Sequence, residues 1–438
     1  MTDRHTDTLS MASSPAADEF AAAVLLFATH RPNAVAALDR AIAKEPHFIA
    51  AYALKGFAAL TMARTELNAA ARRAGKDAHN AAIQVNATLS ETALLTALDV
   101  ALEGHFLEAA DRLECRLRQE PENFLLLKLA HALRFMAGDR AGMLAATTNV
   151  LPFWDRSDPQ SGYVFGCHAF GLEEDGNYTE AARFAELALS LVPDDAWGLH
   201  ALCHVYEMQG RTSEGISRLE QASSIWKQCN NFRFHMAWHL ALHYLEAGDV
   251  GRVLDLYDQE IYPDPSDDYR DISNATSLLW RLRLAGVDVG LRWCALKTIA
   301  LRRAADTTLT FASLHHLFSL VATGEIDAAT KALDEWQTHA KAGGHDQAVV
   351  ARRVGVVLGR VIAGVSVPVS AYRDIADDLS LLGGSRAQRD VFMQTLVCMA
   401  DKAGDRKMMQ DLLAIRRSQR AIDRFDGMIT NAAIIRTQ

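Results

Sequence analysis

Glycines return along the chain at nearly constant spacing, and this spacing limits the fold more than any other feature. The first two intervals of interest, Gly104 to Gly138 and Gly176 to Gly210, are each 34 residues, and three later intervals are 38 residues. The segments between them are rich in Ala, Leu and Arg and contain few prolines, which favours helices over strands. A period of about 34 residues with two helices and a glycine turn is typical of tetratricopeptide repeats. The glycines of the series are Gly104, Gly138, Gly176, Gly210, Gly248, Gly286 and Gly324.

The repeat predicts an all-α fold, a tetratricopeptide-like solenoid in which paired helices form an α-α superhelix. Each helix pair has an apolar face that only a neighbouring pair can cover, so the pairs are expected to stack. We expect residues 1–18 to form a disordered leader and residues 19–438 to form one irregular solenoid without separable domains. Near the end, Ser385 follows two glycines and is suited to cap the next helix.

Composition excludes several classes of protein. The net charge of −9 disfavours nucleic acid as a partner. No run of about 18 apolar residues predicts a membrane span, and the polar start of the chain lacks the apolar core of a signal peptide. The six cysteines are scattered without a C-x-x-C pair, which indicates reduced thiols in a cytoplasmic protein.

Candidate chemistry is concentrated in residues 197–248, where two predicted helices carry five of the 16 histidines. On the first helix, His200 and His204 are four residues apart and Glu207 is three residues further on. On the second, His235 and His239 repeat the four-residue spacing. Residues at these spacings share one face of a helix.

The turn glycines predict where these side chains point. In a tetratricopeptide unit, first-helix residues about three, six and ten positions before the glycine line the concave groove. Those positions before Gly210 hold Glu207, His204 and His200. Because neighbouring helices lie about 8–10 Å apart, imidazoles from both helices are expected to meet in a groove site within residues 160–320.

The same offsets add two residues to the predicted site, Glu173 before Gly176 and Trp238 before Gly248. We assign them to cofactor or ligand binding. His243 and His315 lie near this pattern, and the sequence leaves open whether they join the site.

Such a cluster suits a divalent transition metal, zinc or iron, because imidazole nitrogen and carboxylate oxygen are ligands of both. The predicted metal ligands are His200, His204, Glu207, His235 and His239. Glu207 and His239 are the predicted catalytic groups. Two histidines four residues apart occur in zinc peptidases, but Ala201 stands where those enzymes carry their catalytic glutamate.

Several sequence blocks resemble the tetratricopeptide repeat protein 38 family. They span roughly residues 160–400 in order and include residues 170–174, 200–210, 235–242, 277–282 and 383–390. The resemblance implies an irregular tetratricopeptide solenoid. The family motif positions that carry over are His200, His204, Glu207, His235, Trp238 and His239, with His315 beside them. It implies no particular biochemical activity.

Three functional hypotheses follow from these residues. The first is a metal-dependent enzyme, either a hydrolase or a non-haem iron oxygenase, acting on a small organic molecule in the groove. The second is a non-catalytic scaffold that binds a peptide or partner protein, which is the common use of the fold. The third is acid–base catalysis without metal. A homodimer is left open, and the substrate is not indicated.

Overall fold

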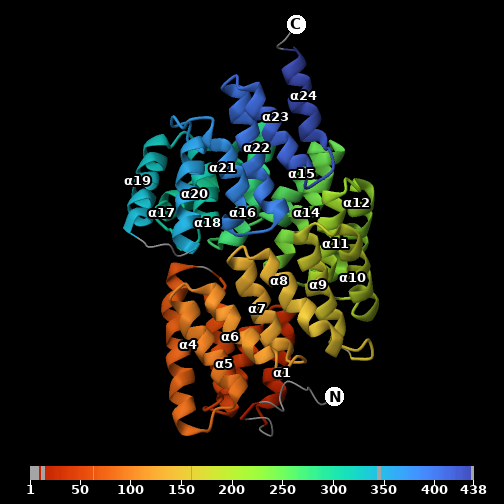
Figure 1. The fold of residues 1–438 in the computed structure, drawn as a ribbon, viewed down its shortest axis with the longest axis vertical. Helices are drawn as coiled ribbons and strands as arrows, with labels where there is room; N and C mark the ends of the chain where they lie inside the picture. Colours follow the sequence, from red (N-terminus) through yellow and green to blue (C-terminus); the bar gives the residue numbers. More distant parts are fainter. Residues whose placement is uncertain (1–8, 11–14, 63, 159, 343–346, 436–438) are drawn as a thin grey trace. The chain divides into compact units, whose positions relative to one another are not determined.

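The computed structural model describes residues 9–10, 15–62, 64–158, 160–342 and 347–435. These residues form helices joined by short turns, and no β-strand occurs among them. The predicted all-α helical-repeat class is therefore confirmed. The chain divides into two compact units. Figure 1 shows the helices coloured by their position in the sequence. The first unit contains residues 1–202 and 224–232, and the second contains residues 203–223 and 233–438.

In the first unit consecutive helices pack as hairpins, including α3 with α4, α6 with α7, and α9 with α10. Its helices are α1 (Ala17–Ala28), α2 (Ala34–Lys44), α3 (Ile49–Leu60), α4 (Thr65–Gln84), α5 (Leu89–Leu102), α6 (Phe106–Leu117), α7 (Phe124–Met136), α8 (Arg140–Val150), α9 (Ser161–Asp175) and α10 (Tyr178–Leu191), followed by the first part of α11 (Ala196–Met208) and most of the short α13 (Ser223–Trp226).

The second unit continues the hairpin pattern, with α17 against α18, α19 against α20, and α22 against α23. It contains the last part of α11, then α12 (Thr212–Gln221), α14 (Phe232–Ala247), α15 (Val250–Leu256), α16 (Tyr269–Leu284), α17 (Trp293–Arg303), α18 (Thr310–Ala322), α19 (Ile326–Ala342), α20 (Gln347–Ile362), α21 (Ala371–Asp378), α22 (Arg386–Lys402), α23 (Arg406–Arg417) and α24 (Arg424–Ile435).

The turn glycines explain the regular spacing of the hairpins. All seven predicted glycines have positive φ angles, between 68° and 91°, and Gly364 and Gly404 continue the series. At Gly176 the backbone N–H donates to the Glu173 carbonyl, and the N–H of Asn177 donates to the Leu172 carbonyl. This pattern ends a helix in the left-handed conformation that only glycine adopts at little cost.

The expected capping serine has the predicted role. Ser385 accepts a hydrogen bond from the backbone N–H of Gln388, whose side chain in turn accepts from the backbone N–H of Ser385. This reciprocal capping box starts α22.

Two boundaries differ from those expected of the sequence. Helix α1 begins at Ala17, inside the expected leader, and the rest of that leader falls mainly on residues 1–8 and 11–14, outside the described residues. The sequence predicts one continuous solenoid, whereas the chain passes from the first compact unit to the second within α11, between Leu202 and Cys203.

Candidate functional site

Three of the predicted histidines come together inside the second unit. His204 lies on α11, and His235 and His239 lie one turn apart on α14. Each presents a potential ligand atom, and these atoms lie within 4.8 Å of one another. His204 and His239 are fully buried, and His235 is partly buried. We call His204, His235 and His239 the histidine cluster.

Within the cluster, two imidazoles face each other through the same ring atom. The Nε2 atoms of His239 and His235 are 3.1 Å apart. On the other side of the His235 ring, Nδ1 lies 2.9 Å from the Oδ1 atom of Asn274 on α16. Nδ1 of His239 lies 3.4 Å from a carboxylate oxygen of Glu207. The contacts therefore run from Glu207 through both imidazoles to Asn274.

This arrangement limits where the protons are. Burial lowers the pKa of His235 to about 4, so its ring is neutral near pH 7. If the His235 Nδ1–H donates to the Asn274 amide oxygen, Nε2 of His235 carries a lone pair. The His239 Nε2–H then donates to that lone pair. A metal ion at the Nε2 atoms would move the His239 proton to Nδ1, beside Glu207.

Glu207 lies at the outer edge of the cluster. Its side chain is 8% exposed, and its second oxygen lies 3.6 Å from the Arg420 guanidinium. Burial raises the pKa of Glu207, while the charge of Arg420 acts against that rise. The sequence predicts Glu207 as both a metal ligand and a catalytic group. In the structure Glu207 faces the Nδ1 side of His239. A carboxylate in this position can orient a metal-binding histidine.

Trp238 also supports the cluster from the same helix. Its indole stacks on the His235 imidazole with ring centroids 5.2 Å apart, and its N–H donates to the Ser277 hydroxyl. The side chain is fully buried. In this structure Trp238 therefore holds a histidine ring in place.

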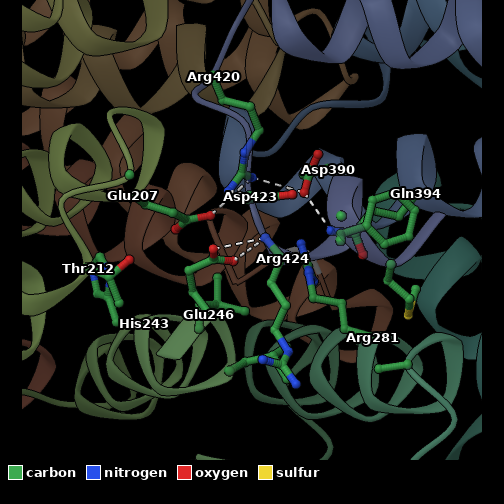
Figure 2. Close-up of a pocket in the computed structure, with 17 residues that line it drawn as sticks. Glu207, Thr212, His243, Glu246, Arg281, Asp390, Gln394, Arg420, Asp423 and Arg424 are labelled. Atoms are coloured by element: carbon green, nitrogen blue, oxygen red, sulfur yellow. Dashed lines mark hydrogen bonds and ion pairs between the residues drawn. The ribbon is translucent and has the colours of Figure 1, made fainter. Parts of the chain in front are cut away.

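A cavity of about 520 Å³ adjoins the cluster within the second unit. Figure 2 shows Glu207, Arg281 and Arg420 approaching this cavity from different elements. Apolar side chains, among them Leu242 and Leu245, complete its wall. Its volume falls within the range of small-molecule sites. Since Glu207 both lines the cavity and contacts His239, the cavity and the histidine cluster are neighbours.

A buried ion-pair network forms one side of the cavity. Arg416, whose side chain is 1% exposed, bonds to Asp390, Asp423 and Asp426. Arg420 lies 3.0 Å from the same Asp390. These charges hold the pKa of Asp390 below its usual value despite burial.

The other two predicted residues, His200 and Glu173, belong to the first unit. His200 lies one turn before His204 on α11 but belongs to the first unit, where its ring stacks on Phe170 and packs 4.9 Å from Trp197. Glu173 is fully buried on α9 of the first unit.

The two histidines left open by the sequence differ from each other. His243 is buried and lines the cavity, and burial lowers its pKa to about 4. The Nδ1–H of His315 donates to the Phe311 carbonyl at 2.7 Å, and its ring packs against Phe311 and Phe392. His315 is therefore part of the helix packing.

Sequence reasoning missed the contribution of α16. Asn274, Ser277 and Arg281 recur at intervals of three and four residues and are all buried. Polar residues on one face of a helix whose neighbours are apolar are a signal for a buried polar site. The sequence around Asp390 and Arg416 shows no such pattern, and their role becomes visible only from the buried ion pair that they form with each other.

Comparisons with known proteins add little to this description. No family model matches the chain. Among solved structures it is similar to a chain in a structure of Naa15/Naa10 bound to HypK-THB, with 14% sequence identity and a TM-score of 0.26. The match covers 94% of this chain and 64% of the chain in that structure. This chain therefore spans less than two thirds of the length of the chain that it matches. Among the described residues, no helix has the length and apolar character to cross a membrane. The helices and their hairpin packing in the described residues are those of a helical-repeat protein.

Proposed function

We propose that the protein is a metal-dependent enzyme that acts on a small organic molecule in the cavity of the second unit. The proposed ligands of the ion are His204, His235 and His239. The observation that carries this proposal is the facing pair of Nε2 atoms at 3.1 Å, each on a ring whose Nδ1 lies beside an oxygen acceptor.

The separation of these atoms suits one ion. Zinc–nitrogen bonds of about 2.0–2.1 Å place two ligands on one ion roughly 2.9–3.4 Å apart, depending on the coordination angle. Metal-bound histidines usually donate their second ring N–H to an oxygen, which is the role open to Glu207 and Asn274. One ligand atom from each of His204, His235 and His239 lies within 4.8 Å of the other two.

The chemistry follows from neutral ligands beside a cavity. A divalent ion held by three imidazoles would supply Lewis-acid activation of water, or of dioxygen if the ion is ferrous iron. Glu207 would hold the proton of the His239 Nδ1 atom and orient the ring. The cavity would place a substrate next to the same carboxylate.

Metal analysis of the purified full-length protein tests this proposal. After expression in medium supplemented with zinc and iron, plasma mass spectrometry should find about one equivalent of a transition metal. His204→Ala and His239→Ala should each lower this content at least about tenfold, while His315→Gln, a buried histidine outside the cluster, should keep it. Less than about a tenth of an equivalent in the wild type would refute the metal site.

A non-catalytic scaffold that binds a peptide or partner protein is the second candidate. The helical-repeat architecture of the described residues favours it, by analogy with other repeat proteins. Under this candidate the histidine cluster only packs the helices. His239→Ala would then lower thermal stability while metal content stayed below a tenth of an equivalent in every variant, wild type included.

A further inference from the structure

Arg281 is a buried cation at the cavity that forms no ion pair with any described residue. Its residue is 5% exposed, and it lines the cavity. Its two terminal nitrogens donate to the backbone carbonyls of Ser277 and Ala387, at 3.3 and 2.8 Å. The guanidinium also lies over the Trp238 ring, 5.5 Å from its centroid. Among the described residues, no carboxylate oxygen lies within 4.0 Å of it.

The nearby carboxylates are engaged elsewhere. Asp390 accepts from Arg416, Arg420 and Gln394. Glu246 accepts from the backbone N–H of Arg424, and Figure 2 shows this contact at the cavity. Glu207 lies against His239 and Arg420. None of these groups makes a direct ion pair with Arg281.

A buried charge without a direct ion pair is costly, because the protein interior solvates it less well than water does. The more distant carboxylates of Asp390 and Glu207 offset only part of this cost. Burial lowers the pKa of Arg281 to about 10, so the side chain is still a cation at neutral pH. A guanidinium has five N–H donors, and the two backbone carbonyls occupy only part of them. The remaining donors are suited to a ligand that carries negative charge and two oxygens.

We propose that the cavity binds a small organic carboxylate, whose carboxylate group accepts hydrogen bonds from Arg281. This proposal names the substrate class of the proposed enzyme, and it rests on that function only in taking the cavity as the substrate site. The apolar side chains of Leu242, Leu245 and Met428 would contact the organic part. Arg281 would act as a substrate-binding residue and fix the orientation of the ligand.

The cavity favours one negative charge over two. Glu207, Glu246, Asp390 and Asp423 also line it, and like charges in a poorly solvated site repel strongly. A single cation without an acidic partner is neutralised by a monoanion, whereas a phosphate dianion would leave an excess charge beside these groups.

Ligand binding to full-length wild type and Arg281→Met tests the proposal. Acetate, butyrate and benzoate serve as monoanionic probes, with benzamide as the neutral control and inorganic phosphate as the dianionic arm, all at constant ionic strength. Saturation-transfer NMR and thermal unfolding should detect binding of at least one carboxylate to the wild type. Arg281→Met should weaken that binding at least about tenfold, with circular dichroism confirming that the variant is folded. Arg281→Lys, which keeps the charge but loses the planar fork, should weaken binding by a smaller factor.

Each contrary result overturns the proposal. No response of the wild type to all three carboxylates would do so, and so would equal affinity of wild type and folded Arg281→Met. Binding of phosphate or benzamide that is stronger than binding of every carboxylate would refute the carboxylate class. His239→Ala separates this inference from the metal site. Carboxylate binding that persists there without metal supports the Arg281 site, whereas binding lost there but kept in Arg281→Met would assign the anion to the ion.

Discussion

Substitution of Arg416 should strongly lower the free energy of unfolding of the second unit. Arg416 is the common partner of Asp390, Asp423 and Asp426, and all four side chains are at most 8% exposed. Arg416→Met keeps much of the side-chain length but removes the charge. Among the described residues, the three carboxylates then retain Arg420 and Arg417 as ion-pair partners.

The expected loss follows from that burial. Breaking a buried ion pair by removing one partner costs about 3–5 kcal/mol, because a charge is left without compensation. Arg420 can neutralise part of the remaining charge, so we expect about 3 kcal/mol. With a urea dependence of about 1–3 kcal/mol per molar, this loss lowers the midpoint of the transition by at least about 1 M.

Urea unfolding of the full-length chain, followed by circular dichroism at pH 7, measures this change. Lys407→Met is the matched control. Lys407 forms an exposed ion pair with Asp411 on the same helix as Arg416. Lys407→Met should change stability by less than about 1 kcal/mol. Adding Asp390→Asn to Arg416→Met should recover part of the loss. A loss below about 1 kcal/mol for Arg416→Met would refute the assignment of this network to stability.

Two further predictions concern the metal site and the pH dependence of stability. Asn274→Leu removes the acceptor of the His235 Nδ1–H and should weaken metal binding about 10- to 100-fold; competition with a chelator measures it, and unchanged affinity would show that Asn274 does not orient the ligand. Burial lowers the folded-state pKa of His315 to about 3. Between pH 7 and 5 this histidine is therefore protonated only in the unfolded state, and the stability of the fold decreases as the pH is lowered. This protonation contributes a loss of about 2 kcal/mol at pH 5, and urea titrations of His315→Gln should show a correspondingly shallower decline, whereas an identical decline would contradict the prediction.

The repeat turns could be read from the sequence, because the physical requirement lies in single residues. A positive φ angle strongly favours glycine, so the spacing from Gly104 to Gly324 recorded the turns directly. The Ser385 cap was equally local. The facing of His204, His235 and His239 followed from helical periodicity, which places residues on faces but does not set the distance between two faces.

The remaining features depend on contacts between distant residues. The lack of an acidic partner for Arg281 can be recognised only once the partners of Asp390 and Glu207 are known. Asn274 was missed because its role comes from the ring of His235, 39 residues earlier. The division into two units follows from the balance of contacts within and between segments, which no local pattern reports.

The boundary inside α11 has a consequence for how the protein is made and cut. The chain leaves the first unit after Leu202, returns at Ser224 and leaves again after Phe232. No single truncation can therefore release either unit intact. During synthesis the first unit is complete only after residue 232 has left the ribosome, when residues 203–223 of the second unit are already exposed and await partners from the last 206 residues.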